Sequence, residues 1–171
     1  APVASRAFSS SAPAAANSAL VLVADAANFN FSTGATRALT SIDASGVTLS
    51  RVAGNMTTTG TQRYAGLLLT GAAGNRGFSG SSLAYLGAVD AANNTIGMIA
   101  NGPAGVGFAG NVGLGGVGGT NLAQLLVSGP ATLAGNVRTV GGTSFGNALT
   151  TVGVRTVDAA GLFVGGATTL G

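Results

Sequence analysis

The chain has no cysteine, histidine, lysine, glutamate or tryptophan. Without cysteine it can form no disulfide, thiolate nucleophile or thiolate metal site. The other absences remove most of the side chains that act as general acids, general bases or metal ligands. The sequence therefore predicts a protein that is not an enzyme and that takes no cofactor and no metal.

Charge is also scarce, because Asp, Glu, Lys and Arg make up 6% of the chain, against about a quarter in a typical soluble domain. The seven basic residues are all arginines, no two of them lie within ten residues of each other, and the net charge is +3. Nucleic-acid binding needs clustered basic residues with aromatics to stack on bases. We therefore expect no nucleic-acid partner.

No long apolar run is present, since the longest aliphatic segment, residues 19–24, is far shorter than the roughly 20 residues that cross a bilayer. We expect no transmembrane segment. The chain opens Ala1-Pro2-Val3-Ala4, without a charged and then apolar leader, which is expected of a mature chain whose signal peptide has been removed or of a fragment. This favours a secreted, extracellular or cell-surface location.

The first 19 residues are rich in Ser, Ala and Pro, and such a composition buries too little apolar surface to offset its ordering entropy. They are predicted to form an extended N-terminal arm, and residues 20–171 a separate folded domain. In that domain, short β-branched and aliphatic runs alternate with Gly, Asn, Ser and Asp, which is typical of strands joined by tight corners. The 30 glycines, each costing about 1 kcal/mol relative to Ala inside a helix, argue against long helices.

Short segments that begin with Gly-Asn recur along the chain, namely Gly54–Thr61, Gly110–Thr120 and Gly135–Thr143, with Gly74-Asn75 as a possible fourth copy. Intervals of roughly 20 to 36 residues between them are within the range of repeat arrays. Coils of about 20 to 25 residues would give roughly seven coils. The predicted fold is therefore all-β, a parallel β-helix (β-solenoid) with Gly/Asn corners.

The segment Thr57–Leu69, TTTGTQRYAGLLL, resembles the "TTxGxQxYxGxVxL" repeats of filamentous-haemagglutinin-type exoproteins and large bacterial adhesins. Residues 164–171, VGGATTLG, are similar to the companion half of that repeat. Together the two segments cover about a fifth of the chain. The resemblance implies a right-handed parallel β-helix that projects from a cell surface.

Each of the four aspartates, Asp25, Asp43, Asp90 and Asp158, precedes two small residues and then Asn or Gly. This context favours a corner over a catalytic pair of carboxylates. The run Gly113–Gly118 fits GxGxxG, but no acid follows it until Asp158, so we predict a tightly packed glycine-rich coil rather than a nucleotide site.

Two sets of side chains leave alternatives open. The aromatics Tyr64, Tyr85, Phe78, Phe108, Phe145 and Phe163 could line a carbohydrate groove or stack in the core. The threonines Thr57, Thr58, Thr59, Thr61, Thr168 and Thr169 could form an ice-binding face. They are too bunched for regular ranks, which favours an ordinary role as β-formers.

The resulting functional hypothesis is a secreted structural protein that assembles with itself into a fibre or sheath by strand stacking. Residues 1–24 are predicted to take part in the contact, with Leu20, Val21, Leu22 and Val23 adding a strand to a neighbour's open edge. A rival hypothesis is that the arm packs on, or caps, its own first coil. The alternative functions are an adhesin fragment that binds a host or glycan surface and, third, an ice-binding module.

Overall fold

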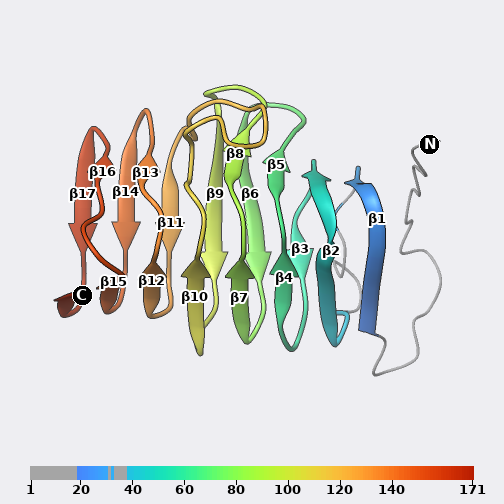
Figure 1. Cartoon of the computed structure of the whole chain (residues 1–171), viewed down its shortest axis with the longest axis horizontal. Helices are drawn as coiled ribbons and strands as arrows, with labels where there is room; N and C mark the ends of the chain where they lie inside the picture. Colours follow the sequence, from blue (N-terminus) through green and yellow to red (C-terminus); the bar gives the residue numbers. More distant parts are fainter. Residues whose placement is uncertain (1–18, 31, 33–37) are drawn as a thin grey trace.

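The structure is a computed structural model that describes residues 19–30, 32 and 38–171. In these residues the regular elements are eighteen β-strands, without a helix, and they coil into a β-solenoid (Figure 1). The predicted all-β parallel solenoid is confirmed. The predicted arm lies outside the described residues except for Ala19, which begins the first strand.

Three faces of parallel strands wind around a common core. The first face contains β1 (Ala19–Phe29), β2 (Ser41–Val52), β4 (Gln62–Tyr64), β7 (Ser82–Tyr85), β10 (Gly105–Phe108), β12 (Ala131–Leu133), β15 (Leu149–Thr151) and β18 (Thr168–Leu170). The long strands β1 and β2 continue onto the second face. There β2 pairs with β5 (Leu67–Leu69), and β5 pairs with β8 (Val89–Ala91). An isolated bridge at Val112 connects β8 to β13 (Val137–Arg138), which pairs with β16 (Val157–Asp158). The third face contains β3 (Met56–Thr57), β6 (Gly74–Ser79), β9 (Ile96–Asn101), β11 (Leu125–Val127), β14 (Gly142–Phe145) and β17 (Gly161–Val164).

The register of the first face gives the length of each coil. One column of paired residues runs through Leu20, Ile42, Gln62, Leu83, Val106, Ala131, Leu149 and Thr168. The steps range from 18 residues, between Ala131 and Leu149, to 25 residues, between Val106 and Ala131. The expected seven or so turns are therefore present, with coils of unequal length.

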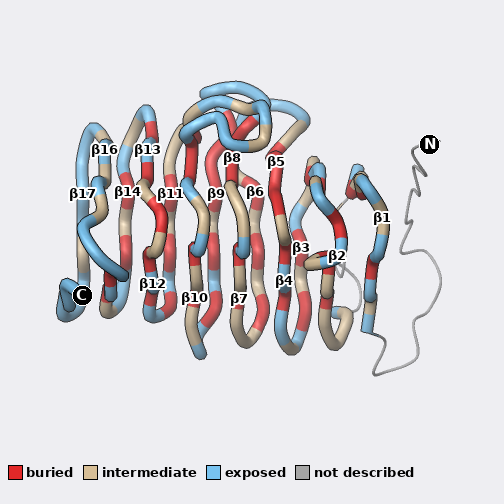
Figure 2. Tube along the Cα trace, viewed as in Figure 1, coloured by how far each residue is buried: buried red, intermediate tan, exposed pale blue. Residues whose placement is uncertain are grey.

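Buried and more exposed residues alternate along many of the strands, and buried residues occur in most of the coils (Figure 2). The two ends differ. Leu22 and Phe29, which point inward from β1, are buried, whereas Leu162 and Leu170 in the last coil are 54% and 78% exposed. The last coil therefore leaves inward-facing apolar side chains exposed, whereas those of β1 are buried.

Only some of the Gly-Asn segments occupy equivalent positions in successive coils. Asn111 and Asn136 do stack, because the Oδ1 of Asn111 accepts from the Asn136 backbone N–H at 3.0 Å. Asn55 instead lies beside Gly77, whose N–H donates to its Oδ1 at 2.8 Å, so the interval from Asn55 to Asn75 is not one coil.

A corner motif explains the similarity between the segments that begin at Gly54 and Gly135. In both, a threonine hydroxyl donates to the carbonyl two residues later, from Thr58 to Gly60 at 2.9 Å and from Thr139 to Gly141 at 3.0 Å. The first corner joins β3 to β4, from the third face to the first, and the second joins β13 to β14, from the second face to the third. The repeat therefore marks a turn geometry that is used at two different corners.

Candidate functional site

The predicted assembly residues form the start of β1, at one end of the solenoid (Figure 1). Val21 and Val23 are 69% and 85% exposed on the outer surface, while Leu22 points inward and is buried. Leu20 is half-buried against the core. One edge of β1 pairs with β2, and no described strand pairs with the other edge.

The last coil forms the opposite end. The strands β16, β17 and β18 each pair on one side, with β13, β14 and β15, and no described strand pairs with their outer edges. Phe163 on this coil is 61% exposed. Unpaired strand edges beside exposed apolar side chains are general sites of strand addition.

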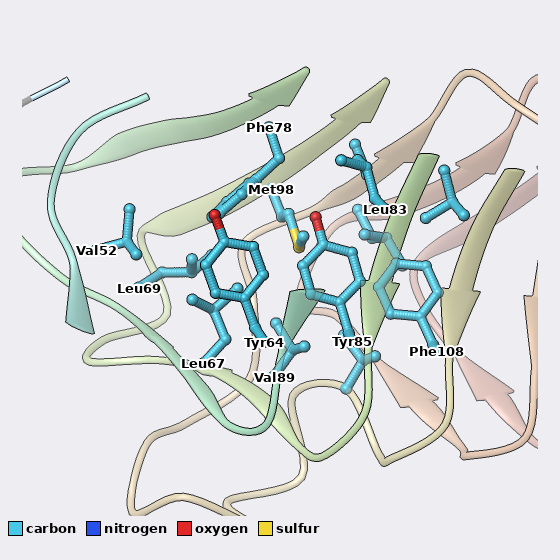
Figure 3. Packing of buried hydrophobic residues seen from close by; sticks show 14 of the residues in the cluster. Val52, Tyr64, Leu67, Leu69, Phe78, Leu83, Tyr85, Val89, Met98 and Phe108 are labelled. Atoms are coloured by element: carbon cyan, nitrogen blue, oxygen red, sulfur yellow. The ribbon is translucent and has the colours of Figure 1, made fainter. Parts of the chain in front are cut away.

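The aromatic side chains lie mainly inside the solenoid. Tyr64 stacks on Tyr85 with ring centroids 5.9 Å apart, and Tyr85 stacks on Phe108 at 5.0 Å (Figure 3). Phe78 approaches both tyrosines edge-on, at 5.7 and 5.9 Å. Phe145 is also buried, and of the six candidates only Phe163 is exposed. These five buried rings form part of the core, so the carbohydrate-groove hypothesis is wrong for them.

The two tyrosine hydroxyls differ in their partners. Tyr64 donates to the Oε1 of buried Gln62 at 2.9 Å, and Gln62 Nε2 in turn donates to the carbonyls of Met56 and Ser79 at 3.1 and 2.8 Å. The Tyr85 hydroxyl has no hydrogen-bond partner. Burial raises the pKa of both phenols well above the ordinary value, and for Tyr85 the neighbouring Tyr64 adds to the effect. Gln62 and Tyr64 of the TTxGxQxYxG motif thus have structural roles in the core.

The corner interpretation of the four aspartates is wrong, because all four lie in strands. Asp25 is exposed in β1, and Asp158 in β16 pairs with Arg138 at 2.9 Å on the surface. Asp43 lies at an irregularity of β2, where the register with β1 shifts. There the hydroxyl and the backbone N–H of Ser45 both donate to its carboxylate, and these bonds hold the pKa of Asp43 below its usual value.

Asp90 has a role that the sequence did not indicate. Its carboxylate is fully buried, although it points outward from the second face, because the glycine-rich segment 113–119 lies over it. The carboxylate accepts from the backbone N–H groups of Gly115 at 3.0 Å and Val117 at 2.8 Å. We call residues 113–119 the glycine strap.

The strap departs from the predicted packed coil, since most of its residues are exposed and it contains no strand. Gly113, Gly115 and Gly118 have φ angles of 70°, 79° and 82°, a region that glycine adopts without strain. A Cβ on Gly119 would lie 2.6 Å from both the Ala91 carbonyl oxygen and the Asp90 Cβ. The glycines therefore let the strap turn sharply and lie close against β8.

We expect the substitution Asp90→Ala to release the strap and to destabilise the protein by about 3 kcal/mol or more. It removes a buried acceptor from two backbone donors, and each such charge-assisted bond contributes about 1.5 to 3 kcal/mol. Denaturant unfolding measures the loss, and hydrogen exchange of the Gly115 and Val117 amides should accelerate. Asp158→Ala is the control, because its ion pair is exposed and should contribute less than about 1 kcal/mol. Equal effects of the two substitutions would contradict the role of Asp90.

The threonines do not form a regular outer face. Thr58 is buried and Thr57 half-buried, while Thr132, Thr150 and Thr169 form one exposed column on three successive coils. The preceding positions in that column are Ala84 and Gly107. One short column gives little support to an ice-binding surface.

Within the described part of the chain, no helix is long and apolar enough to cross a membrane, and no group of three or more His, Cys, Asp or Glu side chains could hold a metal ion. Comparison with protein-family models, with curated proteins and with solved structures gives no match in any of the three.

Proposed function

We propose that this chain is a secreted structural protein whose copies associate through strand edges into an extracellular fibre or sheath. The observation that carries the proposal is the pair of open edges, β1 at one end and β16 to β18 at the other, neither of which has a partner strand among the described residues. Open parallel edges add strands readily. In this proposal the chain is not an enzyme and takes no cofactor.

The low charge also supports assembly. Soluble β proteins protect their edges with charged residues, especially lysine, and this chain has no lysine. The large apolar side chains exposed near the start of β1 are Val21 and Val23, and the only charged side chain of that strand is Asp25. Such an edge offers little electrostatic resistance to a neighbouring strand.

An adhesin of the filamentous-haemagglutinin type is the second candidate, supported by the resemblance of residues 57–69. Because Gln62 and Tyr64 are used inside the core, binding in that segment would fall to the exposed Thr59, Thr61 and Arg63. Replacing these three residues by alanine would abolish binding to a glycan array or to host cells if this candidate is correct. Self-assembly should be unaffected.

To test the proposed assembly, we expect the purified chain to form filaments in negative-stain electron microscopy, and the double substitution Val21→Lys with Val23→Lys to prevent them. Both side chains are largely exposed, so the lysines should leave the fold intact while charging the β1 edge. Leu86→Lys is the matched control, since Leu86 is also exposed but lies between β7 and β8, in the middle of the solenoid and away from either end. A wild-type chain that remains monomeric in sedimentation at high concentration would refute the proposal.

A further inference from the structure

Two opposite charges occupy the same position at the two ends of the solenoid. On the second face, one column of paired residues runs from Ala27 in β1 through Ser50, Leu67, Val89, Val112 and Val137 to Val157 in β16. Asp25 lies two residues before Ala27, and Arg155 lies two residues before Val157. Between these ends the same position is held by Thr48, Ala65, Gly87, Gly110 and Gly135. The acid and the base thus mark the first and last coils at one corner.

From this arrangement we propose that copies of the chain stack head to tail, with β1 of one copy on the last coil of the next and Asp25 paired with Arg155 across the junction. The inference rests on the proposed function and names the partner surface of β1. It specifies one junction, whereas the proposed function requires only that strand edges meet.

Strand direction favours this junction. Every strand pair in the described sheets is parallel. A copy translated along the solenoid axis therefore presents β1 to β18 and β16 in the orientation that adjacent coils already have. In the same register, Leu20 would lie over Thr168 and Leu22 over Leu170. Such a junction is heterologous and repeats without closing, which builds a filament.

The charges are available for the junction. The one ion pair among the described residues joins Arg138 to Asp158, so neither Asp25 nor Arg155 has an oppositely charged partner there. Arg155 is half-buried and its Nε has no hydrogen-bond partner. Successive coils lie about 4.8 Å apart, a spacing that the long arginine side chain spans easily. The junction would also cover Leu170 and Leu162, the apolar side chains that the last coil leaves exposed.

The test exchanges the two charges in the full chain. We expect Asp25→Arg and Arg155→Asp, made separately, each to raise the concentration at which filaments form by about threefold or more, because an attraction at the rim of the junction becomes a repulsion. The double substitution should return that concentration to within about twofold of the wild type. Thr132→Asp is the control, since it also adds an acidic side chain but on the exposed surface of β12, which has paired strands on both sides and lies away from the junction.

Mixing the two single variants separates the junction from any defect in folding. Every contact between unlike copies then pairs an arginine with an aspartate, so the equimolar mixture should assemble as well as the double variant. If the single variants assemble like Thr132→Asp, or if neither the mixture nor the double variant recovers, the head-to-tail pair is wrong and assembly must use another contact. If the wild type forms no filament at all, the proposed function fails instead.

Discussion

Raising the pH above about 10 should unfold the protein in a transition controlled by Tyr64 and Tyr85. Burial raises the pKa of both phenols above the ordinary value of 10.0, so the folded state keeps them protonated while the unfolded state ionises. The contribution of the two tyrosines to the free energy of unfolding is therefore fully present below pH 10 and is lost as the pH rises above 10. The slope should be about 1.4 kcal/mol per pH unit for each tyrosine, or about 2.7 for both.

The chain isolates this effect well, because it has no cysteine or lysine to titrate in the same range and arginine loses its proton only above about pH 12. Two pH units beyond 10 would cost roughly 5 kcal/mol, which is comparable to the whole stability of many domains. Denaturant titrations at fixed pH measure the slope, and phenolate absorbance reports the ionisation. Phenolate absorbance that rises near pH 10 while the β-sheet circular dichroism stays native would show that the two rings are accessible to solvent.

Single tyrosine substitutions give matched controls for that slope. Tyr85→Phe and Tyr64→Phe should each halve it. At pH 7 they should differ, because Tyr85→Phe removes a buried hydroxyl that has no partner and should be neutral or stabilising. Tyr64→Phe removes the hydrogen bond to Gln62 and should cost about 1 kcal/mol.

Gly129→Ala should destabilise the solenoid by about 3 kcal/mol or more, which corresponds to a fall in Tm of roughly 10 °C for a chain of this size. A Cβ at residue 129 would lie 1.8 Å from the carbonyl oxygen of Gly102 and 2.7 Å from its carbon. Both atoms belong to the backbone of the coil below. The two coils must therefore separate to admit the methyl group, which weakens the hydrogen bonds between them.

Gly107→Ala is the control for the glycine effect. Gly107 lies in β10, no atom lies within 4 Å of where its Cβ would be, and its φ angle is not positive. This substitution should be neutral or stabilise the protein by about 0.4 to 1 kcal/mol, because alanine reduces the entropy of the unfolded chain. Thermal unfolding followed by circular dichroism compares the two variants. Similar melting temperatures would show that coil spacing tolerates a side chain at residue 129.

The fold class could be predicted because short strands and Gly/Asn corners recur throughout the sequence. The phase of the coils could not, since the corner motif at Thr58 occurs again at Thr139 on a different corner. The burial of Gln62 could not be predicted either, because its side-chain amide donates to carbonyls of two other strands. The sequence around Gln62 does not identify these partners.

The role of Leu20, Val21, Leu22 and Val23 in assembly stays a prediction, and the structure shows only where these residues lie. The run Leu20–Val23 does form the start of an end strand, as its aliphatic residues indicated. The Asp90 contact with the glycine strap joins residues 25 and 27 positions apart. The proposed pairing of Asp25 with Arg155 depends on following the strand register from β1 to β16. Neither can be seen before the coils are placed.

X-ray fibre diffraction from aligned filaments of the purified chain tests the central claim most directly. Eight strands stack on the first face of each copy, so head-to-tail stacking predicts a strong reflection at about 4.8 Å along the filament axis and a subunit repeat of about 38 Å. Filaments whose 4.8 Å reflection is perpendicular to the axis, or a chain that remains monomeric under every condition, would contradict assembly by the stacking of solenoid ends.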